Sequence, residues 1–419
     1  MIEEMTIQAI KAAINDREVF IYGVNLEGNG ICRLFSHHGI RVCGFIDTRI
    51  FDDNKKLGKP VLHPDSFFAT ASPEKKFIII GTKFRTYKKL AIKSCEKKGF
   101  KKNIDYLIST ELCNYMPTIE VSGVCNLRCI SCNMGMKEKK KGGFMSLDTY
   151  KEVLEKMTSE IPLMNSICLY LWGEPQLNKE LPEIIRATAE QGLACDISTN
   201  LNFSKHLERV VQAAPDMLSV PCSGIGKNYE MTHTGAKWDR FKNNLYSLRN
   251  YIDKHSSDTA VRVIFHMYKH NLSEDFNKVE SITKELGFYF FPIIANIFPE
   301  QVYHFVINNK DLPEQMKRIN GHMIFPLEEQ LAWAYEKRHL FCPNMKAFPT
   351  VRWDKSVILC CNMEEPTIAR NYLETTLTEL DTVRENHPFC NACQQHGIHR
   401  FFDVNGKVEL IDGKRIASR

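Results

Sequence analysis

Three closely spaced cysteines constrain the fold of this chain more than any other feature of its sequence. They follow a short apolar run and read Cys125-Asn-Leu-Arg-Cys129-Ile-Ser-Cys132. Thiolates at this spacing can hold three irons of a [4Fe–4S] cube and leave the fourth iron open to another ligand. A structural zinc site instead needs four protein ligands around one ion, and no fourth cysteine lies close in the sequence. The spacing of this cysteine triad therefore favours an iron–sulfur cluster with one open position.

A second set of grouped cysteines comes late in the sequence: Cys342, Cys360, Cys390 and Cys393. Four thiolates close either a zinc site or a [4Fe–4S] site, and the spacing leaves both open. Cys361 adjoins Cys360, and neighbouring side chains on an extended segment face opposite ways. Only one of these two thiols is therefore expected to be a ligand, and we favour Cys360.

The composition is that of a globular chain in a reducing compartment. Hydrophobic content of 43% and charged content of 25% are typical of soluble proteins. No stretch of eighteen apolar residues is present, and the net charge of +5 is small, so we expect neither a membrane nor a nucleic acid as a partner. The start of the sequence resembles an amphipathic helix more than a signal peptide. With an odd count of fifteen cysteines, these features predict a cytoplasmic protein whose grouped thiols bind metal.

Residues 1–112 are predicted to form a Rossmann-like domain, because three apolar runs alternate with helical stretches. The runs are Glu18–Gly23, Ile40–Asp47 and Phe77–Gly81. In the turn Gly23-Val-Asn25-Leu-Glu-Gly28 the side chain of Asn25 stands where a dinucleotide fingerprint needs glycine, while Asp47 lies where a ribose-binding acid is expected. Whether this domain binds a nucleotide or serves docking is left open.

Residues 113–300 repeat a rhythm of strand, loop and helix that predicts a partial (β/α)6 barrel. The expected strands are Thr118–Ser122, Ser166–Trp172, Ala194–Ser198, Met217–Val220, Ala260–Met267 and Tyr289–Ile293. Chemistry in such barrels lies at the C-terminal ends of the strands, which is where the cysteine triad follows the first strand. Residues 301–419 form a third predicted domain, which carries the second set of cysteines.

The triad and its surroundings resemble the radical S-adenosylmethionine (SAM) superfamily. The resemblance implies that the open iron binds SAM and that an electron from the cluster cleaves SAM to a 5′-deoxyadenosyl radical. It also implies a cofactor-binding set of residues at the ends of the following strands: Gly173, Glu174, Ser198, Asn200 and Ser223. Two positions depart from the family pattern: Trp172 replaces a glycine, and Ser131 replaces an aromatic residue near the adenine.

Within this cofactor-binding set the resemblance gives each residue a role. Gly173 and Glu174 belong to the turn Leu171-Trp172-Gly173-Glu174-Pro175, in which the acid meets the methionine amine. Ser198 and Asn200 are expected at the ribose, and Ser223 at the ribose or the carboxylate. The alternative is that the serines and Asn200 are ordinary turn-forming residues, and that Glu174 is a surface carboxylate after a strand.

Two further resemblances concern the outer domains. Residues 301–419 resemble a SPASM or twitch extension, which implies one auxiliary [4Fe–4S] cluster held by the second set of cysteines. Such a cluster would carry an electron to or from the substrate radical. The stretch from Ile21 to Leu62 resembles small domains that accompany sugar-modifying enzymes. A reductant such as flavodoxin or ferredoxin is the implied electron donor.

The sequence therefore predicts a radical SAM oxidoreductase that abstracts hydrogen from a small polar substrate, with a sugar or nucleotide sugar favoured, in an oxidation or an epimerisation. The alternative is a SPASM-type enzyme that modifies a peptide or protein. A non-enzymatic iron–sulfur scaffold is disfavoured by the intact triad with Glu174 behind it. Cys222 is a candidate hydrogen-atom donor, with a buried apolar role as the alternative. His233 and His270 are candidate general bases in loops.

Overall fold

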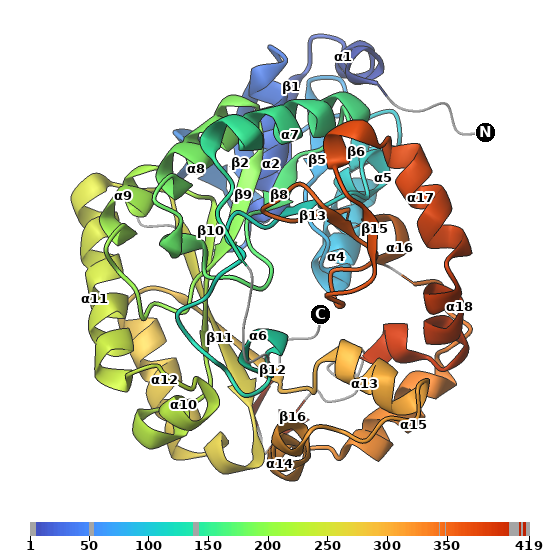
Figure 1. Ribbon diagram of the computed structural model, residues 1–419. Helices are drawn as coiled ribbons and strands as arrows, with labels where there is room; N and C mark the ends of the chain where they lie inside the picture. The colour runs from blue at the N-terminus through green and yellow to red at the C-terminus, as the bar shows by residue number, and fades with distance from the viewer. Residues whose placement is uncertain are drawn as a thin grey trace. The chain divides into compact units, whose positions relative to one another are not determined.

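The computed structural model (Figure 1) describes residues 6–49, 54–136, 142–342, 344–347 and 349–401, together with the strand residues 410–411 and 414–415. The chain divides into two compact units. The first comprises residues 1–116, 154–167 and 183–196, and the second comprises residues 117–153, 168–182 and 197–419. The predicted α/β class and the parallel arrangement of its strands are confirmed by the sheets described below.

The first sheet has six strands in the order β3-β4-β2-β1-β5-β6. The pairs within β4-β2-β1-β5-β6 are parallel, and β3 joins the edge antiparallel to β4. The strands are β1 Glu18–Tyr22, β2 Val42–Ile46, β3 Lys55–Lys56, β4 Lys59–Leu62, β5 Lys76–Ile80 and β6 Tyr106–Ile108. Strands β3, β4 and β6 were not predicted, because segments of two to four residues are too short to show a strand pattern.

The sheet of the first unit is buried on both faces. Side chains alternate along β1, so that Val19 and Ile21 join one hydrophobic cluster while Phe20 joins another. A parallel sheet buried in this way needs continuous apolar strands, which explains the uninterrupted runs seen in the sequence. The helices of this part of the chain are α1 Ile7–Ile14, α2 Leu26–His37, α3 Pro64–Thr70, α4 Arg85–Lys97 and α5 Ser109–Leu112.

The second sheet has nine strands in the order β12-β11-β10-β9-β8-β7-β13-β14-β15. All six strands predicted in residues 113–300 are present and neighbour one another in chain order. They are β7 Thr118–Ile119, β8 Ser166–Cys168, β9 Ala194–Ser198, β10 Met217–Cys222, β11 Ala260–Met267 and β12 Tyr289–Ile294. Strand β13 (Thr350–Val351) pairs in parallel with β7, and the antiparallel strands β14 (Val357–Ile358) and β15 (Thr367–Ala369) extend the edge.

Strands β7 and β8 are shorter than predicted. The apolar pattern continues to Ser122 and Trp172, but the regular strands end at Ile119 and Cys168. Beyond these points the backbone bonds across to other segments: Glu174 N–H donates to the carbonyl of Val124 at 2.8 Å. The apolar residues after each strand therefore form loops that build the site described below.

Helices connect and cover the strands of this sheet. The helices up to residue 285 are α6 Asn133–Met136, α7 Leu147–Glu160, α8 Leu181–Glu190, α9 Leu207–Gln212, α10 Gly226–Thr232, α11 Trp238–His255 and α12 Glu274–Glu285. Helix α7 starts after Ser146, whose hydroxyl accepts the N–H of Thr149 at 3.2 Å as an N-cap residue does. Helix α12 packs on β11 and β12, and α9 packs on α11 (Figure 1).

The later helices are α13 Pro299–Val306, α14 Glu314–His322, α15 Leu327–Glu336, α16 Asn344–Ala347, α17 Leu377–Asn386 and α18 Pro388–Gln395. Side chains of α13, α14, α18 and the following turn share a hydrophobic cluster, which includes Val302, Met316 and Phe401. Strands β16 (Leu410–Ile411) and β17 (Lys414–Arg415) form a two-stranded antiparallel sheet. In the described part of the chain, no helix has the length and apolar character needed to cross a bilayer.

Candidate functional site

The cysteine triad lines one cavity of about 190 Å³ in the second unit. We call this the triad cavity. Its lining includes Cys125, Cys129 and Cys132, and every residue that the resemblance implied in SAM binding: Gly173, Glu174, Ser198, Asn200 and Ser223. Residues up to 98 positions apart in the chain are thus brought together at the ends of neighbouring strands.

Backbone hydrogen bonds hold the triad loop against a later loop. The N–H of Arg128 donates to the carbonyl of Thr234 at 2.9 Å, and the N–H of Ile130 donates to the carbonyl of Thr232 at 3.1 Å. Gly135 lies so close to the loop that an added Cβ would stand 2.2 Å from the carbonyl oxygen of Cys129. These contacts fix the backbone that carries the three thiols.

Glu174 is a buried carboxylate at the wall of the triad cavity. Glu174 is only 2% exposed. One carboxylate oxygen accepts the N–H of Gln176 at 3.1 Å and the other accepts the N–H of Asn200 at 2.8 Å. Burial raises the pKa of Glu174 to about 7. Both carboxylate oxygens of Glu174 are therefore held by backbone N–H groups at the wall of the cavity.

Asn200 lies at the wall of the triad cavity and contacts the triad loop. Its side-chain nitrogen lies 3.7 Å from the sulfur of Cys125 and donates to the side-chain oxygen of Asn126 at 2.9 Å. Its backbone N–H is the donor to Glu174 already described. Asn200 therefore contacts both the triad loop and the buried acid, which sequence spacing alone did not indicate.

Glu120 is a residue of the site that sequence reasoning missed. It is 3% exposed, and one carboxylate oxygen accepts the N–H of Trp172 at 3.1 Å and the N–H of Gly173 at 3.3 Å. Burial raises its pKa to about 7. Glu120 therefore holds the turn that carries Glu174. The available signal was an acid inside the apolar run that precedes the triad.

His233, one of the two candidate general bases, is buried. It lines the triad cavity, and its ring stacks on Tyr229 with centroids 4.5 Å apart. Its Nδ1 lies 3.0 Å from the hydroxyl of Thr232. Burial lowers the pKa of His233 to about 4. His270, the other candidate base, is half-buried, stacks on Tyr268 and is not among the described residues that line the cavity.

The shifted pKa of His233 predicts a loss of stability on acidification. Its folded pKa is lowered from 6.5 to about 4, so its contribution is present above pH 6.5 and is lost as the pH falls towards 4. The full contribution is about 3 kcal/mol. A His233→Phe protein, which keeps a ring against Tyr229, is expected to lose less unfolding free energy than the wild type between pH 7 and pH 4.5.

Urea unfolding at the two pH values measures this difference. His339→Phe, which makes the same change at an exposed histidine, serves as the control and should follow the wild type. Equal pH dependence in the His233→Phe and wild-type proteins would contradict the prediction.

The second set of cysteines lines another cavity of the second unit, of about 50 Å³. We call this the C-terminal cavity. Its lining includes Cys342, Cys360, Cys390 and Cys393. Cys390 and Cys393 lie three residues apart on α18 and therefore share a face of that helix. Of the two adjacent thiols after β14, Cys360 borders the cavity, and Cys361 is not among the described residues that do so.

Each set of cysteines lines a cavity of the second unit. Among the described residues, no three His, Cys, Asp or Glu side chains converge on a point where one metal ion could bind. Residues 298 and 299 link a contact of one cavity lining to the other cavity lining. Trp172 of the triad cavity packs edge-on against Phe298 with centroids 4.5 Å apart, and Pro299 lines the C-terminal cavity.

Cys222 is not brought into the triad cavity. Its neighbours Pro221 and Ser223 line the cavity, while Cys222 itself is absent from the described lining. The thiol is fully buried and contacts the carbonyl of Gly224 at 3.3 Å. This placement follows from the alternation of side chains along β10. The geometry favours the buried apolar role for Cys222 over that of a hydrogen-atom donor.

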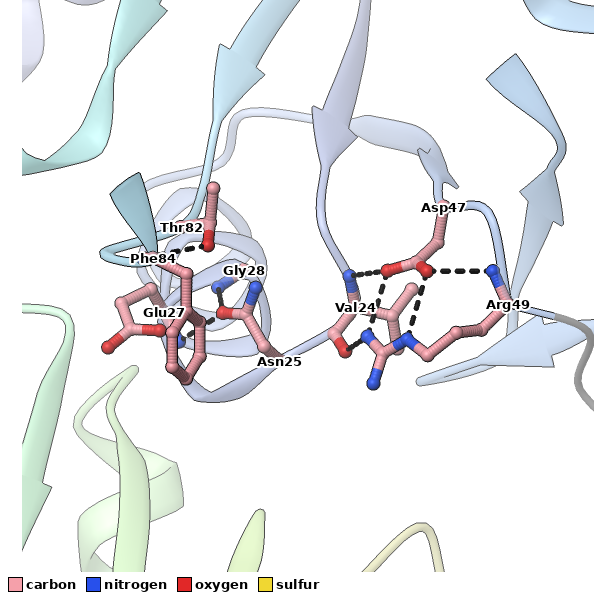
Figure 2. Close-up of polar contacts among 8 residues, drawn as sticks. All are labelled: Val24, Asn25, Glu27, Gly28, Asp47, Arg49, Thr82 and Phe84. Atoms are coloured by element: carbon pink, nitrogen blue, oxygen red, sulfur yellow. Dashed lines mark hydrogen bonds and ion pairs between the residues drawn. The ribbon is translucent and has the colours of Figure 1, made fainter. Parts of the chain in front are cut away.

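The dinucleotide-like turn of the first unit is filled by its own side chains (Figure 2). The side-chain oxygen of Asn25 accepts the N–H of Gly28 at 3.1 Å, at the start of α2. Asp47 accepts the N–H of Val24 at 2.7 Å and forms an ion pair with Arg49 at 2.8 Å. In a dinucleotide site these helix N–H groups face the pyrophosphate and the acid faces the ribose. The residues present therefore do not fit a dinucleotide bound in that manner.

Comparison with known families identifies the segment that carries the triad cavity. Residues 119–275 match the family model described as the radical SAM superfamily. The matched range contains the three triad cysteines and the five residues of the SAM-binding expectation.

Two curated proteins are similar over short stretches. The chain is 27% identical over 116 residues to the 7,8-dihydro-6-hydroxymethylpterin dimethyltransferase of Methanocaldococcus jannaschii, which covers 27% of this chain and 23% of that protein. It is 30% identical over 76 residues to the Fe-coproporphyrin III synthase of Methanosarcina barkeri, and this stretch covers 18% of this chain and 18% of that protein. The chain thus spans about a fifth of the length of these relatives.

Solved structures show similarity at low identity. BtrN in complex with AdoMet and 2-DOIA is 17% identical, with 70% of this chain and 90% of that chain covered and a TM-score of 0.40. SuiB of Streptococcus suis bound to the precursor peptide SuiA is 12% identical, with 75% and 73% covered and a TM-score of 0.45. AnSMEcpe with bound AdoMet is 16% identical, with 66% and 82% covered and a TM-score of 0.43. These similarities carry no inference about the substrate.

Proposed function

We propose that the chain is a radical SAM enzyme that binds a [4Fe–4S] cluster and SAM in the triad cavity, since residues 119–275 match the radical SAM superfamily model. The observation that carries this proposal is the lining of that single cavity by three thiols and a buried carboxylate. Cys125, Cys129 and Cys132 would hold three irons. When bound, the cluster supplies the electron that cleaves SAM, and the resulting 5′-deoxyadenosyl radical abstracts hydrogen from the substrate.

The residues around the cavity fit SAM by their chemistry. Glu174 offers a buried carboxylate to the methionine amino group, and its position is fixed by the N–H groups of Gln176 and Asn200. Ser198, Asn200 and Ser223 offer hydroxyl and amide groups to the ribose and the carboxylate. Trp172, also in the lining, has a buried Nε1 without a hydrogen-bond partner among the described residues. A ligand with oxygen and nitrogen atoms would satisfy such a donor.

We also propose that the chain is built from three domains. The consecutive order of β7 to β12 supports a partial (β/α)6 barrel in residues 113–300, and the order of the first sheet supports a Rossmann-like domain in residues 1–112. The four thiols around the C-terminal cavity support a SPASM/twitch domain in residues 301–419 with one auxiliary [4Fe–4S] cluster. A flavodoxin or ferredoxin would deliver electrons, and a cytoplasmic location remains a prediction.

For the substrate we propose a small polar molecule, favouring a sugar or nucleotide sugar, that is oxidised or epimerised. The resemblance of residues 21–62 to domains of sugar-modifying enzymes supports this choice. The alternative is a SPASM-type peptide or protein maturase, which the C-terminal set of four thiols supports.

Anaerobic reconstitution with iron and sulfide tests the proposal. Two clusters predict about eight irons per chain, and addition of SAM with a strong reductant should yield 5′-deoxyadenosine. A protein that binds no iron at the triad, or cleaves no SAM, would contradict it. Comparing product formation from added nucleotide sugars with that from peptides then separates the two substrate classes.

The auxiliary ligand after β14 can be identified by a matched pair of variants. Cys360→Ala is expected to bind less iron per chain than the wild type, because one iron of the auxiliary cluster is left without its protein ligand. Cys361→Ala removes the adjacent thiol outside the described lining and is expected to keep the wild-type iron content. Iron analysis after reconstitution measures both. The reverse result would make Cys361 the ligand.

A further inference from the structure

Arg384 is a buried cation at the wall of the C-terminal cavity. It lies on α17, is 1% exposed and lines the cavity together with the four thiols. Its Nε donates to the carbonyl of Leu359 at 3.3 Å, and its Nη1 lies 3.3 Å from a carboxylate oxygen of Asp381. Its Nη2 is buried and has no hydrogen-bond partner in the described part of the chain.

This arrangement is incomplete without an anionic group in the cavity. A buried guanidinium is stable only if its charge is offset and its donors are satisfied. Asp381 provides one carboxylate, and its side chain is 16% exposed, so solvent weakens the compensation. The remaining donor, Nη2, needs a hydrogen-bond acceptor. A metal group held by thiolates is anionic and can accept this hydrogen bond. Arg384, Cys360 and Cys390 line the same cavity of about 50 Å³.

We propose that Arg384 is the counter-ion of the metal group held by Cys342, Cys360, Cys390 and Cys393, and that it raises the reduction potential of this group. This inference rests on the auxiliary cluster of the proposed function. Reduction adds one electron from the donor to the cluster without breaking a bond to the protein, so the anionic charge increases by one. A fixed cation in a poorly screened interior stabilises the reduced form more than the oxidised form.

The guanidinium offers more than its charge. Its planar fork can donate to Leu359, to Asp381 and to the cluster at the same time, whereas a lysine ammonium is a point charge on a flexible stem. Hydrogen bonds to the sulfurs of such clusters also raise the potential. The contributions of charge and of hydrogen bonding to the reduction potential can therefore be separated by comparing a lysine with a neutral residue at position 384.

Three variants of the full chain test the proposal: Arg384→Gln, Arg384→Lys and Asp381→Asn. After anaerobic reconstitution, the midpoint potentials of both clusters are measured by a redox titration monitored by EPR. Adding SAM identifies the triad cluster, because SAM binds its open iron, whereas a fully ligated cluster has no such position. Iron and zinc are counted in each preparation.

We expect Arg384→Gln to make reduction of the auxiliary cluster at least tenfold less favourable, a shift of about 59 mV to lower potential for one electron. Arg384→Lys should fall between this variant and the wild type. Asp381→Asn removes the opposing negative charge and should shift the potential upwards. The potential of the triad cluster should stay the same in all three variants and serves as an internal control.

An unchanged auxiliary potential in Arg384→Gln would overturn the proposal, as would a downward or absent shift in Asp381→Asn. If Arg384→Gln loses the cluster or fails to fold, the shift in Asp381→Asn decides the matter, since that change lies at a partly exposed side chain and keeps an acceptor oxygen. A wild-type protein with only about four irons, or with zinc at the second set of cysteines, would instead refute the auxiliary cluster itself.

Discussion

A Cys129→Ala protein is expected to form no 5′-deoxyadenosine above background and to retain only about four of about eight irons per chain. Two thiolates would remain at the triad cavity, and they cannot hold a cluster that has one iron open to SAM. The auxiliary cluster should persist, because its four ligands lie around the other cavity. Iron analysis, EPR spectroscopy and chromatography of the nucleoside product measure the three parts of this result.

Cys43→Ala provides the matched control. Cys43 is a half-buried thiol on β2 of the first unit and belongs to neither cavity lining among the described residues. This control should have the wild-type iron content and activity. Loss of SAM cleavage in both variants would point to general damage from removing thiols, and full activity of Cys129→Ala would refute the role of the triad.

Gly173→Ala is expected to weaken SAM binding at least about tenfold, which corresponds to about 1.4 kcal/mol. A Cβ at this position would stand 1.8 Å from the carbonyl oxygen of Ser122, so backbone must move. The turn cannot move without disturbing the N–H groups that Glu120 accepts or the position of Glu174. Formation of 5′-deoxyadenosine should fall as well. Equilibrium dialysis with labelled SAM measures the affinity of the reconstituted protein.

Gly321→Ala is the control for this substitution. Gly321 lies on α14, and an added Cβ there meets no atom within 4 Å. Alanine is a better helix former than glycine by up to about 1 kcal/mol, so this variant should bind SAM normally and be slightly more stable. If Gly173→Ala bound SAM as tightly as Gly321→Ala, the turn would not be part of the SAM site.

The sequence contained enough information to place the triad cavity. Strand patterns repeat over short distances, and parallel strands in chain order bring their ends together, so the triad and Glu174 could be expected to meet. Glu120 could not be assigned in this way, because its partners Trp172 and Gly173 lie 52 and 53 residues later. Arg384 was equally hidden, since its partner Leu359 is 25 residues away in the chain.

One expectation could have been refined from the sequence alone. Ser223 was expected in the cofactor-binding set and Cys222 as a candidate hydrogen-atom donor, yet adjacent residues at the end of a strand face opposite sides. Of the two, Ser223 is the one among the described residues that line the triad cavity. The lengths of β7 and β8 could not be predicted, because the apolar pattern continues into loops whose backbone bonds to distant segments.

The edge-on contact between Trp172 and Phe298 joins a lining residue of the triad cavity to the chain neighbour of Pro299, which lines the C-terminal cavity. Closely packed side chains transmit displacements instead of absorbing them. If a ligand that displaces the indole changes the affinity at the second set of thiols, thermodynamic reciprocity requires that loading those thiols changes the affinity at the triad cavity by the same factor.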